Sequence, residues 1–427
     1  MPPPLSPLAR IRAVAPPTAV AAGLIAVLVG VTSSAALVFT AARAAGADTR
    51  ETSSWMLAIG VGVALLSVGL SVRYRAPIVT AWSTPGAALL ATSLAGVSMA
   101  KAVGAFLFCA VLMIVSGVTG WFAKAMDRIP VPLASALLAG VLLHFGTGLF
   151  AAMDGSFAVV FPVFALYLLA RRLLPRYAVL VALGAGVVAS VLAGGWHLER
   201  IRLSLAQPVF TTPAFDWKVL ISVGVPLFVV TMASQNLPGV AVLRNSGYDT
   251  PVSPMMTWIG VVQAVLAPFG AFGLNLAAIT AAICTGEEAH PDRGRRYLAA
   301  VWSGVFYLCV GLLGATVVSL LAAMPHALVM AVAGVGLLAT IEASLATALS
   351  DPTAREAAAV TFLATASGVT LLGIGSTFWG LLAGALTSFV ASAWRPGRRP
   401  APVPAQSEAG PERRTGHGLR PSRRAAS

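Results

Sequence analysis

Few side chains in this chain could bind a ligand or carry a proton, and most of those that could lie inside long apolar stretches. Gln235 and Asn236 are adjacent in one such stretch, and Asn275 lies in another. An amide among apolar residues is costly unless it is hydrogen-bonded. These amides therefore either bind a polar group of a ligand or hydrogen-bond neighbouring helices and backbone.

Two titratable residues also lie within apolar stretches, Glu342 in one and His144 in another. Ionisable groups at such positions often belong to proton pathways, so both are candidates for proton coupling. The alternatives are a carboxylate that pairs with a neighbouring helix and a histidine that is hydrogen-bonded within the packing.

Two apolar stretches contain a break that a continuous helix would not tolerate. Residues 76–86 read Ala-Pro-Ile-Val-Thr-Ala-Trp-Ser-Thr-Pro-Gly, and residues 269–276 read Phe-Gly-Ala-Phe-Gly-Leu-Asn-Leu. Each predicts a short extended piece followed by a half-helix, and Pro85 after Thr84 is typical of a helix start. Unpaired backbone groups are very costly in a bilayer, so the two breaks are expected to be buried against each other.

The start of a half-helix carries unpaired N–H groups and the positive end of the helix dipole. Two such starts that converge would form an anion site without Lys or Arg. The breaks and the nearby amides predict these substrate-binding residues: Ser83, Thr84, Pro85, Gly86, Gln235, Asn236, Asn275, Leu276, Ala277 and Ala278. Trp82, Phe269 and Phe272 flank the breaks and are candidate aromatic walls for a ring-shaped substrate, with ordinary packing as the alternative.

The composition places these residues in a membrane. Of the 427 residues, 58% are hydrophobic and 10% are charged, which is too few charges for an ordinary water-exposed surface. A spanning helix needs about 20 apolar residues, so the sequence predicts an all-α polytopic membrane protein with fourteen transmembrane segments. Their ranges are 18–42, 52–72, 76–95, 99–123, 130–150, 156–173, 177–195, 217–241, 252–270, 271–285, 297–323, 325–349, 354–373 and 375–394.

The basic residues test this segmentation, because Lys and Arg collect in cytoplasmic loops. With the N-terminus inside, all but six of the 28 basic residues fall on the cytoplasmic side. Those six are Arg43, Arg50, Lys101, Arg200, Arg202 and Lys218. The sequence therefore predicts that both termini are cytoplasmic.

A polar connection at residues 196–216 divides the segments into seven and seven. An odd number per half forces the second half to insert upside down, which predicts an inverted repeat of residues 18–195 and 217–394. The broken segments are the third in each half, segments three and ten. Residues 1–17 are predicted to be a cytoplasmic tail, and residues 395–427, basic and poor in apolar residues, a disordered cytoplasmic tail.

Other function classes find little support in the sequence. The formal net charge of +13 sits in short loops and in the C-terminal tail, which argues against nucleic-acid binding and fits contact with lipid headgroups. Cys109, Cys284 and Cys309 lack metal-ligand spacing and are interpreted as packing residues. The sequence contains no recognisable cofactor motif, metal cluster or catalytic set, so no cofactor, no metal and no enzymatic activity are expected.

Three long motifs resemble the benzoate/proton symporter family of bacterial inner membranes. They are Pro-Ile-Val-Thr-Ala-Trp-Ser-Thr-Pro-Gly-Ala (77–87), Ala-Ser-Gln-Asn-Leu-Pro-Gly (233–239), and Gly-Ala-Phe-Gly-Leu-Asn-Leu-Ala-Ala-Ile-Thr (270–280) with Ala-His-Pro-Asp (289–292). The resemblance covers about residues 15–395. It implies a fold similar to that of nucleobase and sulfate-type anion transporters, with a core domain (segments one to four and eight to eleven) and a gate domain (segments five to seven and twelve to fourteen). It also implies a substrate held between the extended pieces of segments three and ten, and it allows a homodimer paired through the gate domain.

One departure from that wider fold bears on the substrate. Relatives that carry nucleobases use carboxylates in segments eight and ten, where this chain has Gln235, Asn236 and Asn275. Neutral amides favour an anionic substrate, because a carboxylate ligand would otherwise meet like charge in a low-dielectric site. The sequence therefore predicts proton-coupled uptake of benzoate or a related aromatic carboxylate. The alternatives are a proton symporter of a nucleobase-like neutral ring and an anion channel or exchanger.

Overall fold

The computed structural model describes residues 15–120, 131–194, 203–372 and 374–393. Residues up to Ser388 belong to one compact unit, and a second unit begins at Phe389, within the last described helix. The predicted tail at 395–427, most of the predicted tail at 1–17 and part of the predicted connection at 196–216 lie outside the described residues.

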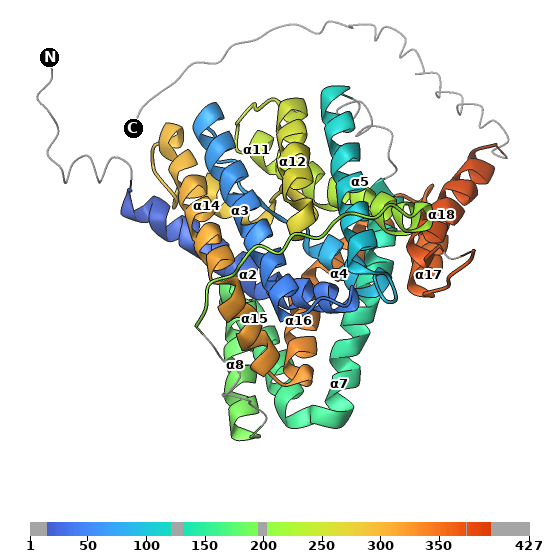
Figure 1. Ribbon diagram of the computed structural model, residues 1–427, viewed down its shortest axis with the longest axis horizontal. Coiled ribbons are helices and arrows are strands. Elements are labelled where there is room, and N and C mark those ends of the chain that lie inside the picture. Colours follow the sequence, from blue (N-terminus) through green and yellow to red (C-terminus); the bar gives the residue numbers. More distant parts are fainter. Residues whose placement is uncertain (1–14, 121–130, 195–202, 373, 394–427) are drawn as a thin grey trace, which may run out of the picture. The chain divides into compact units, whose positions relative to one another are not determined.

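Long helices make up the first half of the chain (Figure 1). They are α2 (Pro17–Ala44), α3 (Thr49–Tyr74), α4 (Thr84–Ser93), α5 (Met99–Val118), α7 (Val131–Leu173) and α8 (Ala178–Leu192). Helix α7 contains a non-helical residue, Ser156 (φ −149°, ψ 45°), where the predicted segments 130–150 and 156–173 adjoin. A kink in one long helix thus stands where the sequence predicts two segments.

The second half begins with a continuous helical run over residues 217–245. It comprises α9 (Trp217–Val219), a π-helical turn η3 (Leu220–Gly224), α10 (Val225–Thr231), a second π-helical turn η4 (Met232–Asn236) and α11 (Leu237–Asn245). Pro226 and Pro238 each follow a π turn closely. Because proline cannot donate the usual backbone hydrogen bond, the wider turn before it is favoured.

The remaining helices follow in order. They are α12 (Val252–Leu266), α13 (Ile279–Thr285), α14 (Tyr297–Leu312), α15 (Gly314–Ala323), α16 (His326–Ala348), α17 (Arg355–Ala366) and α18 (Ser376–Ala393). Six of the described helices are long and apolar enough to cross a membrane, or eight if each of two bent pairs counts as one span. The described chain is therefore helical with several apolar spans, as the composition predicts.

The two predicted breaks contain a small antiparallel sheet. Strand β1 (Thr80–Trp82) pairs with β2 (Leu274–Leu276), with Thr80 opposite Leu276, Ala81 opposite Asn275 and Trp82 opposite Leu274. All of these residues except Ala81 are buried. Two segments that are far apart in the sequence therefore meet inside the helical bundle, and α4 and α13 follow the two strands.

Three long helix pairs form much of the bundle, and two of these helices, α3 and α12, contact the strands. Helix α16 packs along α7, α14 along α3, and α12 along α5. The largest hydrophobic core includes Trp55, Phe106 and Phe272 and encloses the strands. A second core lies among α7, α8 and α16 and includes Tyr167 and Leu328. Helices α7 and α16 also contribute to the largest core, for example through Phe145 and Leu337.

An ion pair links the start of α5 to the start of α9. Lys101 Nζ lies 2.7 Å from Asp216 Oδ2, and Asp216 also accepts a hydrogen bond from the Lys218 N–H. The hydrogen bond from Lys101 is the main cause that lowers the pKa of Asp216 below its usual value. A carboxylate with a depressed pKa stabilises the fold above its unfolded pKa, and this contribution is lost as the pH falls through the folded pKa.

We therefore expect Asp216→Asn to lower the melting temperature slightly, by less than about 2 °C near pH 7, because both partners are partly exposed. Thermal unfolding in detergent measures the difference between wild type and variant. That difference should shrink as the pH is lowered below about 4. A difference that stays constant over this range would contradict the assigned role of the carboxylate.

Candidate functional site

Strand β1 is held by two serines of α3 that were not singled out as functional. Ser67 Oγ accepts the Thr80 N–H at 2.9 Å and lies 2.8 Å from Thr80 Oγ1. Ser71 Oγ accepts the Ile78 N–H at 3.1 Å and donates to the Ile78 carbonyl at 3.0 Å. The spacing of four residues places both serines on one face of α3, and it is the signal by which they could have been found. They satisfy backbone groups that an extended segment leaves unpaired in a bilayer.

Strand β2 is held by two buried amides. Asn236 Oδ1 accepts the Leu276 N–H at 2.8 Å, and Gln263 Oε1, from α12, accepts the Leu274 N–H at 2.9 Å. Gln263 Nε2 also donates to the Phe106 carbonyl at 3.1 Å. Both amide side chains are fully buried. Asn236 therefore hydrogen-bonds the backbone of the second break, and Gln263, which the sequence analysis did not single out, plays the same part.

The start of α4 satisfies most of its own amide hydrogens. Ser83 Oγ accepts the Gly86 N–H at 2.9 Å, the Ser83 carbonyl accepts the Ala87 N–H at 2.7 Å, and Pro85 has no N–H. The Ser83 N–H itself donates to the Gly273 carbonyl at 2.8 Å. The first turn of α4 therefore offers at most the Thr84 N–H to a ligand.

The start of α13 is less fully satisfied. The Ala277 N–H donates to the Val79 carbonyl at 2.9 Å, and the Ala278 carbonyl accepts the Ala282 N–H at 3.0 Å. The side chain of Ala278, which precedes the helix, cannot cap it. The backbone N–H groups of residues 278 to 281 have no acceptor within the helix, because they belong to its first turn. Of the two half-helix starts, the second therefore has more donors to offer.

A cavity of about 500 Å³ lies beside the sheet, a volume typical of small-molecule sites. Six of the candidate residues line it, namely Trp82, Thr84, Pro85, Gln235, Ala277 and Ala278. Parts of α2, α7, α8, α13, α14 and α16 complete the wall, which includes Thr32, Tyr167, Arg171, Thr280, Tyr307 and Thr340. The structure thus brings both half-helix starts and one of the mid-span amides to a single cavity.

The other candidate substrate-binding residues lie outside this cavity wall. They are Ser83, Gly86, Asn236, Asn275 and Leu276. Asn275 pairs with Ala81 in the sheet, so its side chain leaves the sheet on the same face as that of Ala81, which lines the cavity. Its Nδ2 donates to the Gly273 carbonyl at 2.8 Å, whereas its Oδ1 has no hydrogen-bond partner among the described residues.

Two of the three candidate aromatic walls face elsewhere. The Phe272 ring lies 5.6 Å from the rings of both Trp55 and Phe106, and the Phe269 ring lies 5.7 Å from that of Phe210. Gly270 (φ 100°) and Gly273 (φ 53°) turn the chain on either side of Phe272, and this left-handed backbone favours glycine. The turns direct both phenylalanines into the packing, and of the three aromatic candidates only Trp82 lines the cavity.

Trp82 and Tyr307 form an aromatic wall that the sequence predicts only in part. Their ring centroids are 5.4 Å apart in an edge-to-face arrangement. Tyr307 is almost fully buried. The Tyr307 hydroxyl lies so close to Gly30 of α2 that a Cβ on Gly30 would overlap with it. Glycine at position 30 therefore gives the Tyr307 ring its place beside Trp82.

We expect Gly30→Ala to reduce substrate uptake by more than about 10-fold, because the added methyl group displaces the Tyr307 ring within a packed wall. Uptake by purified protein in liposomes is the measurement. Gly69→Ala is the matched control, since a Cβ on Gly69 would meet open space and uptake should be unchanged. Equal uptake by the two variants would show that the Tyr307 position is unimportant.

The charged part of the wall comes from the end of α7. Arg171 Nη2 donates to Glu342 Oε2, on α16, at 2.5 Å. Glu342 is 66% exposed, and its contact with Arg171 is the pair with a neighbouring helix that the sequence analysis gave as the alternative. His144 is exposed on α7, and its ring lies 5.8 Å from that of Phe145. Arg171 lines the cavity, whereas Glu342 and His144 do not.

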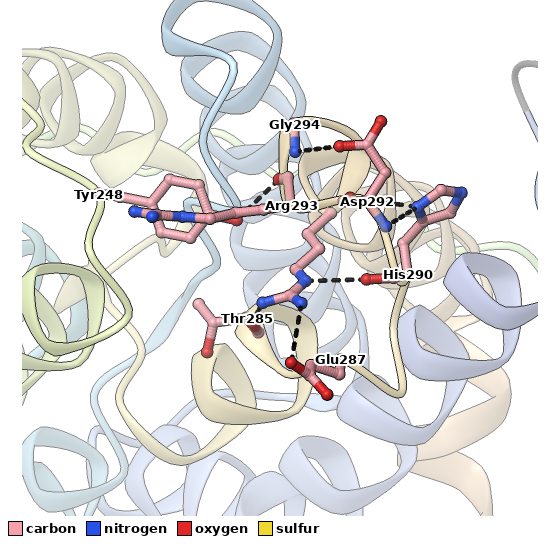
Figure 2. Close-up of polar contacts among 8 residues, drawn as sticks. Tyr248, Thr285, Glu287, His290, Asp292, Arg293 and Gly294 are labelled. Atoms are coloured by element: carbon pink, nitrogen blue, oxygen red, sulfur yellow. Dashed lines mark hydrogen bonds and ion pairs between the residues drawn. The ribbon is translucent and has the colours of Figure 1, made fainter.

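Arginines hold the loop that follows α13 (Figure 2). Arg296 donates to the Thr285 carbonyl, at the end of α13, at 2.9 Å and to the His290 carbonyl at 2.8 Å. The Arg293 guanidinium lies 4.7 Å from the centre of the Tyr248 ring, and the Tyr248 hydroxyl donates to the Arg293 carbonyl at 2.9 Å. The loop between α11 and α12 is thereby tied to the loop after α13. These contacts anchor the far end of the half-helix whose start reaches the cavity.

The sequence is similar to known proteins over most of its length. The profile of the family described as "Benzoate membrane transport protein" matches residues 13–390. The inner membrane protein YdcO of Escherichia coli (strain K12) is 45% identical over 88% of this chain and 96% of its own length. The benzoate membrane transport protein of Acinetobacter baylyi is 37% identical over 87% of this chain and 95% of its own length.

The structure is also similar to solved transporters. It matches a structure of SLC26A9 with a TM-score of 0.58 at 13% identity. The match covers 87% of this chain and 65% of the SLC26A9 chain. It matches the transmembrane domain of the cyanobacterial bicarbonate transporter BicA with a TM-score of 0.52 at 14% identity, over 88% of this chain and 97% of that one. At these identities the likeness shows a common fold and nothing about the substrate.

Proposed function

Because the chain belongs to the benzoate membrane transport protein family, we propose that it imports benzoate or a related aromatic carboxylate together with a proton, by alternating access. The chain is a multi-pass membrane transporter with the fold of the SLC26 and BicA proteins. The observation that carries the proposal is the cavity that the ends of both strands share with an aromatic wall and one arginine.

The apolar and aromatic part of the wall suits a ring. Trp82 and Tyr307 present an edge-to-face pair, and Ala277, Ala278 and Pro85 add small apolar surfaces. A benzoate ring would pack against these residues, and aromatic contacts of this kind contribute about 0.5–1.5 kcal/mol beyond the burial of area.

The polar part of the wall suits a carboxylate. Thr84, Gln235 and Thr280 contribute hydroxyl and amide side chains to it, and such groups can donate hydrogen bonds to a carboxylate. The start of α13 adds amide hydrogens beside Thr280. Within the described wall, Arg171 is the one formally charged side chain, so an anion meets no repulsion there.

Helix packing supports the inverted repeat and the fourteen segments. In that repeat, segment two (α3) corresponds to segment nine (α12), and segment eleven (α14) corresponds to segment four (α5). The α3–α14 and α12–α5 pairs are closely packed, and so are α7 with α16 and β1 with β2. An axis that exchanges the two halves relates the α3–α14 pair to the α12–α5 pair. It relates the α7–α16 pair and the β1–β2 pair each to itself, as expected for two halves of opposite orientation. Both termini would then face the cytoplasm of a bacterial cell.

The cavity wall is shared between the proposed core and gate domains. Trp82, Gln235 and Tyr307 belong to the core segments, and Tyr167 and Arg171 belong to the gate segments. The second apolar core joins three of the gate helices, α7, α8 and α16, which supports their movement together. The cavity reaches Pro175 in the loop after α7, a loop that is cytoplasmic in the proposed topology. A homodimer would pair through the gate helices.

Uptake of labelled benzoate into proteoliposomes tests this function. An inward proton gradient should drive accumulation, a protonophore should abolish it, and excess unlabelled benzoate should compete while uracil and xanthine do not. If one proton accompanies one monoanion, a change of membrane voltage at a fixed pH gradient should leave the rate unchanged.

Each alternative predicts a different result in the same assay. Competition by uracil or xanthine, but not by benzoate, would identify a carrier of neutral rings. Benzoate flux that is unaffected by collapse of the pH gradient would identify a channel or exchanger and would overturn proton coupling.

A further inference from the structure

Arg171 lies in the cavity wall and is paired with Glu342. A substrate carboxylate that binds Arg171 competes with the Glu342 carboxylate for the Arg171 guanidinium. Arg171 lines the cavity, and its Nη2 is 2.5 Å from Glu342 Oε2. Thr340, two residues before Glu342 on α16, also lines the cavity. The pair therefore stands at the edge of the cavity, with the cation at the wall and the carboxylate just outside it.

The pair is also accessible. The Arg171 side chain is 42% exposed and that of Glu342 is 66% exposed, so neither is fixed by deep burial. An exposed ion pair contributes little to stability, and its partners can exchange at small cost. A guanidinium has five N–H donors in a fork that matches a carboxylate. Arg171 can therefore bind a benzoate carboxylate in the same manner in which it now binds Glu342.

We propose that Arg171 docks the substrate carboxylate and that Glu342 is its exchange partner, so that the substrate displaces Glu342 from the Arg171 guanidinium. This inference rests on the proposed function and deepens it. In the empty protein, Arg171 is paired with the Glu342 carboxylate. In the loaded protein, Arg171 is paired with one substrate monoanion and Glu342 is left to the solvent.

The groups that face this pair allow such an exchange. Tyr167, one turn earlier on α7, is almost fully buried and lines the same cavity. The described residues of α8 and the cavity-lining part of α2, Val29 to Ser34, carry no titratable side chain. On α17, Arg355 donates to the Leu349 carbonyl at 2.8 Å, about two turns beyond Glu342, and Glu356 is exposed. Glu342 is thus the carboxylate that these contacts place on Arg171.

Benzoate binding to purified full-length variants at pH 7.5 tests the exchange. Arg171→Gln should weaken binding by more than about 10-fold. Glu342→Gln should strengthen binding at pH 7.5 by about 10-fold, because Arg171 no longer has a competitor. Arg171→Lys should restore part of the affinity, since lysine keeps the charge without the fork.

The charge swap Arg171→Glu with Glu342→Arg separates docking from a structural ion pair. The swap restores a pair between α7 and α16, so the protein should fold and show a melting temperature like that of the wild type. It removes the cation from the cavity wall, so benzoate binding should remain weak. Wild-type affinity in the swap, or weaker binding in Glu342→Gln than in the wild type, would overturn the exchange while leaving the proposed function intact. Absence of benzoate binding to the wild type itself would overturn both.

Discussion

Gln235→Glu should reduce benzoate uptake at pH 7.5 by about 100-fold. Gln235 lines the cavity from the second π-helical turn and is partly buried. A glutamate there would place a negative charge near the carboxylate of the substrate. Two like charges about 5 Å apart repel by about 3 kcal/mol at the effective dielectric constant of a partly buried site, and this corresponds to about two orders of magnitude in affinity.

Initial uptake rates in proteoliposomes measure this effect, and Gln235→Leu is the matched control. Leucine removes the amide without adding charge, so a loss of less than about 10-fold is expected, the size of one hydrogen bond. The ratio of wild-type to Gln235→Glu uptake should fall toward that of the control as the pH is lowered and the new carboxyl becomes protonated. Similar uptake by Gln235→Glu and Gln235→Leu at pH 7.5 would mean that the substrate carboxylate does not approach this residue.

The positions of the long helices and of the strands could be predicted from the sequence because both depend on local pattern. An apolar run of sufficient length specifies a spanning helix, and Pro77 and Pro85 interrupt the helix around β1. The kink at Ser156 was accessible for the same reason, because Asp154 and Gly155 interrupt the apolar run just before it and the sequence predicts a boundary between two segments there. The family relationship follows from motifs around the same breaks, and the profile match over residues 13–390 confirms it.

The side chains that brace the strands could not be assigned with the same certainty. Ser67, Ser71 and Gln263 are single polar residues in apolar helices, and sequence alone does not say which backbone group each one meets. Their partners are residues of the breaks, whose approach depends on the packing of α3 and α12. Asn236 illustrates the same limit, because ligand binding and backbone bracing are equally consistent with a buried amide.

The role of Arg171 was hidden for a different reason. In the sequence it stands at the end of an apolar segment beside Arg172, where the positive-inside rule accounts for any arginine. Only the packing of α7 against α16 brings it to the cavity and to Glu342. The two residues are 171 positions apart, so no local pattern could connect them.

Asn236→Leu should destabilise the protein and abolish most of its transport. Asn236 is fully buried, and its Oδ1 is the acceptor for the Leu276 N–H in β2. Leucine fills a similar volume but leaves that N–H without an acceptor, which costs about 1–3 kcal/mol. Since Leu276 immediately precedes the residues that start α13, a shift of the strand would also move Ala277 and Ala278 in the cavity wall. Uptake should fall by more than about 10-fold, and the melting temperature should fall by several degrees.

Two companion variants separate the contributions of Asn236. Asn245→Leu, at the exposed end of the same helical run, should change neither uptake nor melting temperature. Asn236→Asp keeps an oxygen acceptor for the Leu276 N–H but adds a charge behind the cavity, so it should lose uptake of an anion. Near neutral pH the buried charge also costs stability unless the carboxyl takes up a proton. At low pH the protonated carboxyl of the Asn236→Asp variant should recover both properties, which leucine cannot do. If Asn236→Asp also fails to recover uptake and stability at low pH, the amide nitrogen matters more than the hydrogen bond to the strand. That nitrogen contacts the Met232 sulfur at 3.1 Å.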